Sequence, residues 1–347
     1  MVGAGPLVGI VANPASGKDI RRLVALGSSV DNNEKINIVR RVLRGLEAIG
    51  VGRIAYMPDG YGIVERAAST LDLRPDIAPL PMATLGMPSD SEEAARRLAD
   101  MGAAAIVTLG GDGTNRVVAL GCGDVPLVPV STGTNNVFPR LVEGTLAGLA
   151  AGAVAVGAAA NRPDGPRVVR RHPRLDVSID GAYRTSALID VASTVHAFVG
   201  ARALWRPEDV RDVVLSRISP AEIGLASLGG LLFPEACGGC SGAMIRIDRS
   251  APERLLTPIA PGSIVEVGIA EARLLEHGET VSLRPGPCTV ALDGEREIDI
   301  LDPATVVEVR LEPKGPRVVE IEAAIRVAAA AGAFRRGAAG RSRVGGR

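Results

Sequence analysis

Three apolar runs within the first 130 residues each lead directly into a polar loop that contains glycine. The runs cover residues 7–12, 103–109 and 126–130. Short apolar runs bounded by turn residues are typical of strands that are buried on both faces of a parallel sheet. Residues 35–49 and 91–101 lie between them and carry apolar side chains at helical spacing. Because strands and helices alternate, we predict an α/β domain with a parallel sheet.

The pattern changes after a polar segment near residue 160 that contains proline and glycine. Short β-like runs follow, separated by turns such as Asp180-Gly181 and Asp293-Gly294, and this spacing predicts an all-β, sandwich-like domain. A last stretch is rich in glycine and arginine, which is typical of a disordered basic tail. The predicted divisions are an α/β domain over 1–160, a β-rich domain over 161–320, a helix over 321–333 and the tail over 334–347.

The composition argues against several classes of protein. The 39 basic and 39 acidic side chains give no net attraction to polyanions, and 2% aromatic content leaves few platforms for stacking bases, so a nucleic-acid partner is not expected. We find no apolar stretch of about 20 residues and no signal-peptide pattern, so we expect a cytoplasmic protein without a membrane contact.

The cysteines and histidines carry little information about chemistry. Cys237 and Cys240 have the spacing of a metal or redox pair, but no second pair accompanies them, which favours two ordinary thiols. His172, His196 and His277 lie far apart in the sequence, and structural roles are expected for each.

The polar loops after the three apolar runs are the candidate binding elements. Ligands of parallel α/β sheets bind beyond the carboxyl ends of the strands. Glycine lets the backbone approach a phosphate closely, and the start of the next helix offers free N–H groups. The loops are Asn13-Pro14-Ala15-Ser16-Gly17, Gly110-Gly111-Asp112-Gly113-Thr114 and Ser131-Thr132-Gly133-Thr134-Asn135-Asn136.

Two familiar phosphate motifs are excluded. A Walker A loop needs Lys followed by Ser or Thr, but Lys18 is followed by Asp19. A dinucleotide fingerprint needs a third glycine where this chain has Arg116.

Asp112 is the residue that most restricts the chemistry. A carboxylate among glycines repels phosphate, so it suits a general base or a Mg²⁺ ligand better than a simple binding role. The alternative is an ordinary turn-forming Asp before Gly113, and spacing alone weighs the two equally.

The loops resemble those of a known group of kinases. The Gly110–Thr114 segment resembles the signature shared by NAD kinases, diacylglycerol kinases and sphingosine kinases. Residues 13–17 and 128–136 resemble the first and third loops of the lipid-kinase branch, and Asp293-Gly294-Glu295 resembles the late Asp-Gly motif of the group. The whole pattern, over residues 7–320, is most similar to the AcoX proteins, the NAD kinase-like members found with acetoin catabolism genes.

The resemblance implies a two-domain, homo-oligomeric enzyme that uses ATP and Mg²⁺ to phosphorylate a hydroxyl group, with NAD as the default acceptor. It assigns catalysis, and a Mg²⁺ ligand, to Asp112, and acceptor binding to Asp190. We place Arg116 with the acceptor as well, because its cation could meet a phosphate or a carboxylate. The resemblance assigns nucleotide and phosphate binding to Asn13, Ser16, Gly17, Gly110, Gly111, Gly113, Thr114, Asn115, Ser131, Thr132, Gly133, Thr134, Asn135 and Asn136.

Some positions depart from the group's pattern. Ile189 stands where NAD kinases have an Asn that holds the dinucleotide, and Arg116 stands where lipid kinases have an acid. Arg116 either meets a phosphate or carboxylate, or is a surface residue. Two alternative functions therefore stay open: a non-catalytic nucleotide sensor and a lipid kinase. For the latter, the apolar run over 223–233 would be a lid or acyl surface, although a buried hairpin or helix is favoured.

Overall fold

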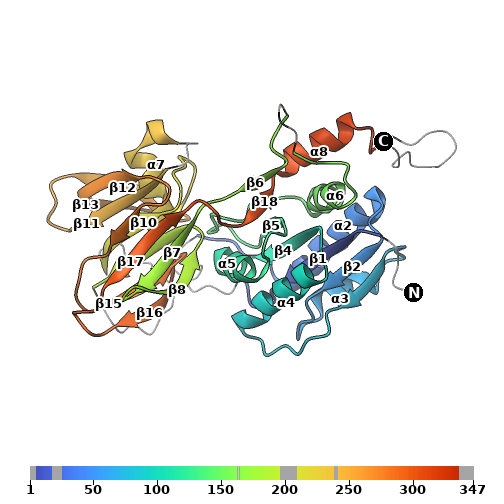
Figure 1. Ribbon diagram of the computed structural model, residues 1–347, viewed down its shortest axis with the longest axis horizontal. Helices are drawn as coiled ribbons and strands as arrows, with labels where there is room; N and C mark the ends of the chain where they lie inside the picture. Colours follow the sequence, from blue (N-terminus) through green and yellow to red (C-terminus); the bar gives the residue numbers. More distant parts are fainter. Residues whose placement is uncertain are drawn as a thin grey trace.

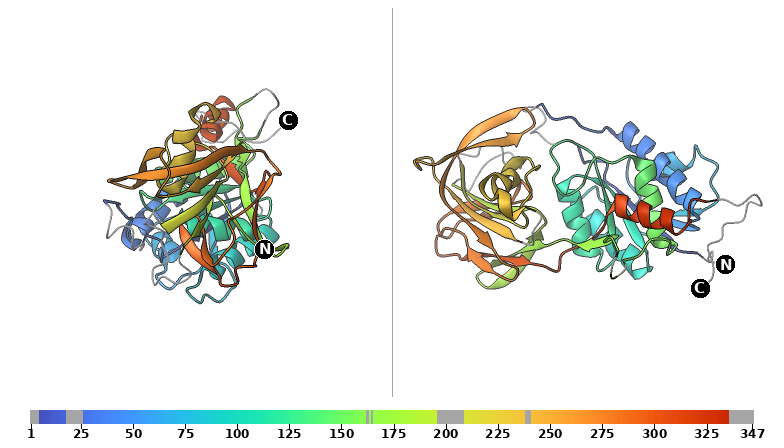
Figure 2. Two further views of the ribbon diagram at one scale, coloured as in Figure 1. Left: turned by 90° about the vertical axis from the view of Figure 1, so that its left-hand side faces the viewer. Right: turned by 90° about the horizontal axis from the view of Figure 1, so that it is seen from above.

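The computed structural model describes residues 5–17, 26–161, 163, 165–195, 209–237 and 241–335. These residues form two domains that lie side by side along the long axis of the molecule (Figures 1 and 2). His196, Cys240 and residues 336–347, which include most of the predicted basic tail, lie outside the described residues. No helix among the described residues is long and apolar enough to cross a membrane.

The first domain contains the predicted parallel sheet. Its strand order is β3-β2-β1-β4-β5-β18-β6, and the first five of these strands are parallel to one another. The central strands β1, β4 and β5 have every residue buried. The bounds are β1 Leu7–Ala12, β2 Arg53–Tyr56, β3 Asp76–Pro79, β4 Ala105–Gly110 and β5 Leu127–Ser131.

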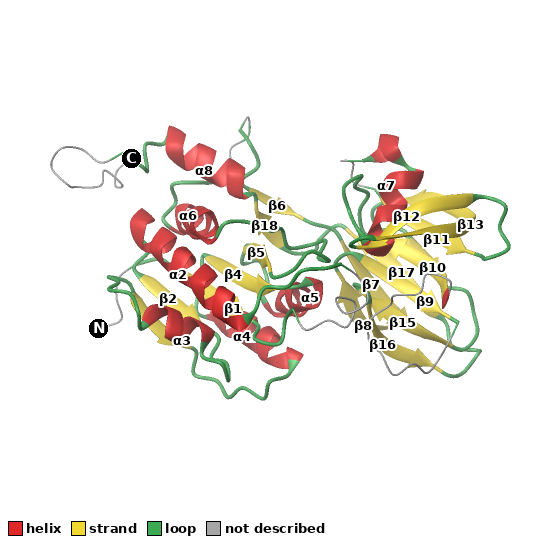
Figure 3. Ribbon diagram, turned by 180° about the vertical axis from the view of Figure 1, so that it is seen from behind, coloured by secondary structure: helices red, strands yellow, loops and turns green. Residues whose placement is uncertain are grey.

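Helices cover both faces of this sheet, as Figure 3 shows. Val8 and Ile10 of β1 point to the core formed with α2, α3, α6 and α8, whereas Leu7 and Val11 point to the core formed with α4 and α5. This alternation along one strand explains why its residues are all apolar. The helices are α2 Asn32–Ile49, α3 Ile63–Ala68, α4 Pro88–Asp100, α5 Asp112–Gly121, α6 Gly144–Ala155 and α8 Ile321–Ala330.

The chain returns to the first domain at its end, which differs from the predicted division. Strands β6 (Val169–Arg171) and β18 (Arg317–Val319) fall within the predicted β domain, yet they pair with each other at the edge of the first sheet. β18 also pairs with β5. Ala324 and Ala328 of α8 then pack into the first core, so the first domain is completed only by the last described helix.

The second domain is the expected β sandwich. One sheet has the order β12-β13-β11-β10-β9-β15-β16 and the other β14-β17-β7-β8, and side chains from both form a shared core. The bounds are β7 Arg174–Ile179, β8 Ala182–Ala187, β9 Asp190–Thr194, β10 Val210–Leu215, β11 Gly242–Ile247, β12 Arg254–Ala260, β13 Ser263–Leu275, β14 Thr280–Ser282, β15 Cys288–Leu292, β16 Glu295–Ile300 and β17 Val307–Glu312.

The apolar run over 223–233 is a packed helical segment. It forms a 3₁₀ turn, Gly224–Ala226, and helix α7, Ser227–Leu232. Leu225 and Leu228 are buried in a core on the outer face of the larger sheet. The favoured alternative, a buried helix, therefore describes this segment.

Candidate active site

The three predicted loops meet at one edge of the first sheet. β4 lies between β1 and β5, so the carboxyl ends of all three strands are adjacent. The Asn13 side chain donates from Nδ2 to Thr114 Oγ1 at 2.9 Å, which joins the first loop to the second. Thr132 Oγ1 donates to Ser16 Oγ at 3.2 Å, which joins the third loop to the first. The loops thus form one connected surface.

Lys35, near the start of α2, holds the first loop through hydrogen bonds to its backbone. Its side chain is fully buried. Its ammonium group donates to the carbonyls of Asn13 and Ser16 and to Asn32 Oδ1, at 2.7–3.0 Å. A buried ammonium needs such partners because its desolvation is costly. Lys35 was not among the predicted site residues, and we assign it the role of holding this loop in place.

The second loop leads into α5 through two glycines that have no room for a side chain. A methyl group at Gly110 would lie 2.4 Å from Thr114 Cβ, and one at Gly111 would lie 2.8 Å from Asn136 Oδ1. Asn115 was predicted to bind phosphate, but it is completely buried. Its side chain accepts from Thr108 Oγ1 at 2.6 Å and donates to the carbonyl of Gly111 at 2.9 Å. Asn115 therefore shapes the loop from within.

Asp112 is the first residue of α5 and is half-buried. Its carboxylate accepts hydrogen bonds from the backbone N–H groups of Val137, at 3.1 Å, and Phe138, at 2.7 Å. The residue that the sequence singled out thus binds the segment after the third loop. Since the start of a helix carries a positive dipole end, it can stabilise both this carboxylate and a nearby phosphate.

The third loop is held mainly by its own side chains. Asn136 Nδ2 donates to Ser131 Oγ at 2.7 Å, and Ser131 Oγ donates to the carbonyl of Gly133 at 2.7 Å. Thr134 Oγ1 accepts from the N–H of Ser28 at 3.0 Å. Asn135 differs, because its buried Nδ2 has no hydrogen-bond partner. A buried donor without a partner is costly, and it suits an incoming phosphate oxygen.

Asp293 forms a second contact of the same kind inside the β domain. Its carboxylate accepts from the backbone N–H groups of Leu188 and Ile189 at 2.7–3.1 Å and from that of Asp190 at 3.3 Å. The Asp293 side chain is fully buried. Burial is the main cause that raises the pKa of Asp293, to about 6, while the Arg116 guanidinium opposes this shift and Asp112 adds to it.

Arg116 links the two domains. Its side chain is 8% exposed, and its guanidinium lies 3.7 Å (Nε) from Asp293 Oδ2 and donates from Nη2 to Glu297 Oε1. Arg116 is therefore not a surface residue, and the carboxylates that it meets belong to its own chain. Glu295, at the start of β16, lies close to the second loop: its Oε1 would be 3.6 Å from a methyl group at Gly113. The Asp293-Gly294-Glu295 segment thus brings a carboxylate to that loop.

The other predicted acceptor residues lie at this same junction. Asp190 is buried, and its carbonyl accepts from the N–H of Asp293 at 2.9 Å. Ile189 is buried in an apolar cluster between the domains with Val137, Phe138 and Leu188. Ile189 therefore packs against the apolar side chains of this cluster.

A cavity of about 410 Å³ adjoins the first loop on the side of β2 and β3. Its lining includes Asn13, Met57, Asp59, Tyr61 and Met87. Asp59 accepts from the N–H groups of Tyr61 and Ile63 at 2.8 and 3.0 Å, and burial raises the pKa of its carboxyl group. The volume lies within the range of small-molecule sites.

Metal binding by protein groups alone finds no support among the described residues. In these ranges, no group of three or more His, Cys, Asp or Glu side chains could hold an ion. Cys237 is a free thiol. Asp112 and Glu295 are the carboxylates nearest to Gly113 along the loop and across the domains. Mg²⁺ in nucleotide sites commonly takes one or two carboxylates together with substrate phosphates, and these two residues fit that pattern.

The fold defines the class of protein: an NAD kinase-like chain, with an α/β domain that is followed by a β-rich domain. Residues 8–155 match the family model of the ATP-NAD kinase N-terminal domain. Residues 173–314 match the model of the acetoin catabolism protein X C-terminal domain.

A curated relative extends the match over nearly the whole chain. The chain is 39% identical over 336 residues to "Acetoin catabolism protein X" of Cupriavidus necator, and the alignment covers 92% of each protein. The chain therefore belongs to the acetoin catabolism protein X family.

Solved structures give looser matches. A diacylglycerol kinase from Bacillus anthracis str. Sterne aligns with a TM-score of 0.42 and 13% identity, covering 91% of this chain and 97% of that one. A putative diacylglycerol kinase from the same organism aligns with a TM-score of 0.43 and 12% identity, covering 91% of this chain and 98% of that one. Scores of this size do not by themselves establish a relationship.

Proposed function

We propose that this protein is an ATP-dependent kinase that phosphorylates a hydroxyl group of NAD or a related small molecule. The observation that carries the proposal is the connected surface of three loops, joined by the Asn13–Thr114 and Thr132–Ser16 hydrogen bonds. This surface lies where α/β proteins bind nucleotides, beyond the carboxyl ends of the strands. The family match to the ATP-NAD kinase N-terminal domain supports the same reading.

In this proposal the loops bind the phosphates of ATP. The start of α5 would offer backbone N–H groups at Gly113 and Thr114, which follow Asp112 in the first turn. Asn135 Nδ2, buried without a partner, would donate to a phosphate oxygen. The nucleoside would occupy the 410 Å³ cavity beside Asn13.

Asp112 would act on the acceptor. Its carboxylate is fixed by the N–H groups of Val137 and Phe138, so its position is set before any ligand arrives. It would take the proton of the attacking hydroxyl or hold Mg²⁺ beside the phosphates. General base catalysis contributes about 10²- to 10⁴-fold, and the rest would come from positioning and charge stabilisation.

The test is ATP-dependent formation of NADP. Purified protein would be incubated with Mg²⁺–ATP and NAD, and the product measured by mass, with Asp112→Asn alongside. NADP made by the wild type and not by the variant supports the proposal with NAD as the acceptor. No NADP directs the search to other soluble acceptors. Unchanged turnover by Asp112→Asn would sink the assignment of Asp112.

The two alternative functions give different outcomes in the same experiment. A nucleotide sensor would bind ATP in a calorimeter and turn over no acceptor. A lipid kinase would phosphorylate diacylglycerol in mixed micelles and leave soluble acceptors untouched. The burial of Leu225 and Leu228 in the core removes one candidate acyl surface, which favours a soluble acceptor.

A further inference from the structure

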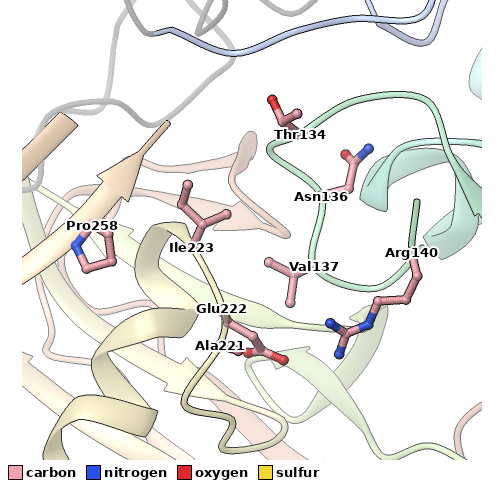
Figure 4. Close-up of a pocket in the computed structure, with 8 residues that line it drawn as sticks. All are labelled: Thr134, Asn136, Val137, Arg140, Ala221, Glu222, Ile223 and Pro258. Atoms are coloured by element: carbon pink, nitrogen blue, oxygen red, sulfur yellow. The ribbon is translucent and has the colours of Figure 1, made fainter. Parts of the chain in front are cut away.

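A second cavity lies between the domains, next to the third loop. It has a volume of about 250 Å³. The first domain contributes Thr134, Asn136, Val137 and Arg140, and the β domain contributes the 221–223 segment and Pro258, as Figure 4 shows. Polar and apolar side chains therefore come from both domains, and Glu222 is the charged residue that the β domain contributes. None of these residues is needed to bind ATP in the proposed function except those of the third loop.

Glu222 is the unusual member of the lining. Its side chain is 2% exposed, and its Oε1 accepts from Arg217 Nε at 3.1 Å. Its Oε2 is buried and has no hydrogen-bond partner. An unpaired buried carboxylate oxygen is costly unless a ligand supplies a donor. The cavity that Glu222 lines is the space from which such a donor would come.

Arg140 supplies the complementary group. Its guanidinium extends toward the Glu222 carboxylate in Figure 4. Arg140 is exposed at the rim. The two side chains therefore offer one acceptor and several donors to a ligand that lies between them.

The cavity is connected to the proposed catalytic residue through one peptide unit. The N–H of Phe138 donates to Asp112 at 2.7 Å, and the carbonyl of Val137, in the same peptide unit, accepts from Arg217 Nη2 at 2.9 Å. Arg217 is also the residue that binds Glu222. A ligand held by Glu222 is thus placed by the same contacts that place Asp112.

The size and lining of the cavity restrict the ligand. A volume of about 250 Å³ lies below the range of roughly 300–1,000 Å³ that is usual for drug-sized ligands, so the cavity suits a small molecule. Val137, Ile223 and Pro258 offer an apolar wall for a short carbon skeleton. The polar side chains of the lining, Thr134, Asn136 and Glu222, suit hydroxyl groups.

We propose that this cavity binds a small polyol, which serves as the phosphoryl acceptor. One hydroxyl donates to Glu222 Oε2, and a second oxygen accepts from Arg140. A third oxygen is directed past Val137 toward Asp112. This inference rests on the proposed kinase function and names its acceptor class.

The transfer step then balances with the groups already named. The third hydroxyl oxygen forms a bond to the γ-phosphorus of ATP, the bond from that phosphorus to the β–γ bridging oxygen breaks, and ADP leaves with the electron pair. The hydroxyl proton passes to Asp112.

Binding is tested first, without reference to turnover. Saturation-transfer NMR would measure glycerol, erythritol and glycerate with the wild type, Glu222→Gln and Ile223→Trp. We expect at least one probe to bind the wild type, and its affinity for Glu222→Gln to be at least about tenfold lower. Ile223→Trp, which fills the cavity without touching a charge, should abolish binding. The exposed residue Glu253 provides a matched control, Glu253→Gln, that should bind like the wild type.

The probes also separate two forms of the ligand. Preference for glycerate over glycerol would show that Arg140 meets a carboxylate, and the reverse would show that it meets a hydroxyl group. No binding of any probe to the wild type, or equal binding to Glu222→Gln and Ile223→Trp, would overturn the inference.

Turnover is measured second, with γ-labelled ATP and the same probes plus NAD. We expect transfer to a polyol with a raised KM in Glu222→Gln and an unchanged KM for ATP. Transfer to NAD with no polyol bound would leave the kinase proposal standing and overturn the acceptor class. Polyol binding that the cavity variants abolish, with no transfer to any acceptor, would instead contradict the kinase proposal and leave the polyol site in place.

Discussion

Asp112 and Asp293 perform the same local task in two different environments. Each carboxylate accepts hydrogen bonds from two successive backbone N–H groups: Asp112 from Val137 and Phe138, and Asp293 from Leu188 and Ile189. Asp112 is half-buried between the three loops, whereas the side chain of Asp293 is completely buried. The comparison shows how burial separates two carboxylates with the same local contacts: only Asp112 is exposed enough to meet a ligand, and we expect Asp293 to have a structural role.

The two contacts also stabilise one interface. Four of the five residues whose N–H groups these two carboxylates bind belong to a single apolar cluster between the domains. Arg116, one turn after Asp112 on α5, reaches across this cluster to Asp293 and Glu297. The Gly110–Thr114 loop and the β domain are therefore joined through the first turn of α5 and the Arg116 guanidinium.

The largest expected effect is the loss of kcat when Asp112, the more exposed of the two carboxylates, is replaced. Asp112→Asn keeps one acceptor oxygen for the N–H groups, so we expect a small change in melting temperature but a loss of about 10²- to 10⁴-fold in kcat. Steady-state rates with whichever acceptor the labelled-ATP assay finds, together with a thermal melt, measure both. If Asp112→Asn lowered the melting temperature and kept its kcat, Asp112 would have the structural role that we assign to Asp293.

Replacing Asp293, the buried carboxylate, should instead lower the stability of the fold. Asp293→Ala leaves Arg116 without one partner and three N–H groups without their acceptor, so we expect a loss of about 3–5 kcal/mol in the free energy of unfolding. Urea unfolding measures it. Asp72, which is exposed, gives the matched control Asp72→Ala, for which we expect less than about 0.5 kcal/mol.

The pH dependence of stability should identify Asp293 as well. Its folded-state pKa, about 6, lies above the ordinary 3.8, so the folded state binds the extra proton between these values. The stabilisation is complete below about pH 4 and is lost as the pH rises through about 6, amounting to about 3 kcal/mol. Urea unfolding across this window should give a smaller decline for Asp293→Asn than for the wild type. If the stability of the wild type and of Asp293→Asn changed with pH in the same way, the raised pKa of Asp293 would be contradicted.

The smallest effect is the coupling between Arg116 and Asp293. Residues that share one ion-pair network show interaction energies of about 0.5–3 kcal/mol in double-mutant cycles. We expect a value in this range for Arg116→Met combined with Asp293→Asn, measured by urea unfolding. Additive effects of the two substitutions would show that α5 and the β domain are joined only by the apolar cluster.

The fold class and the loops could be predicted because their signals are local. Each loop follows a short apolar run and contains the glycines that close approach requires, as at Gly111 beside Asn136. Strands β6 and β18 could not be predicted, because each has three residues and depends on pairing with a partner about 150 residues away. Such short strands carry no periodicity of their own.

The supporting residues of the site were harder to predict than its loops. Lys35 lies in a helix whose charged residues are expected at the surface, and no local feature marks it as buried beneath Asn13. The partners of Arg116 and Glu222 lie on other elements, so their roles depend on tertiary contacts. Asn115 was predicted to face a phosphate, but its place in α5 directs it to Thr108 instead.

The most direct test of the central claim is a crystal structure with Mg²⁺ and a non-hydrolysable ATP analogue. We predict the triphosphate on the three loops, the nucleoside in the cavity lined by Asn13 and Tyr61, and the γ-phosphate facing Asp112. A nucleotide bound away from these loops, or one whose phosphates point away from Asp112, would contradict the account.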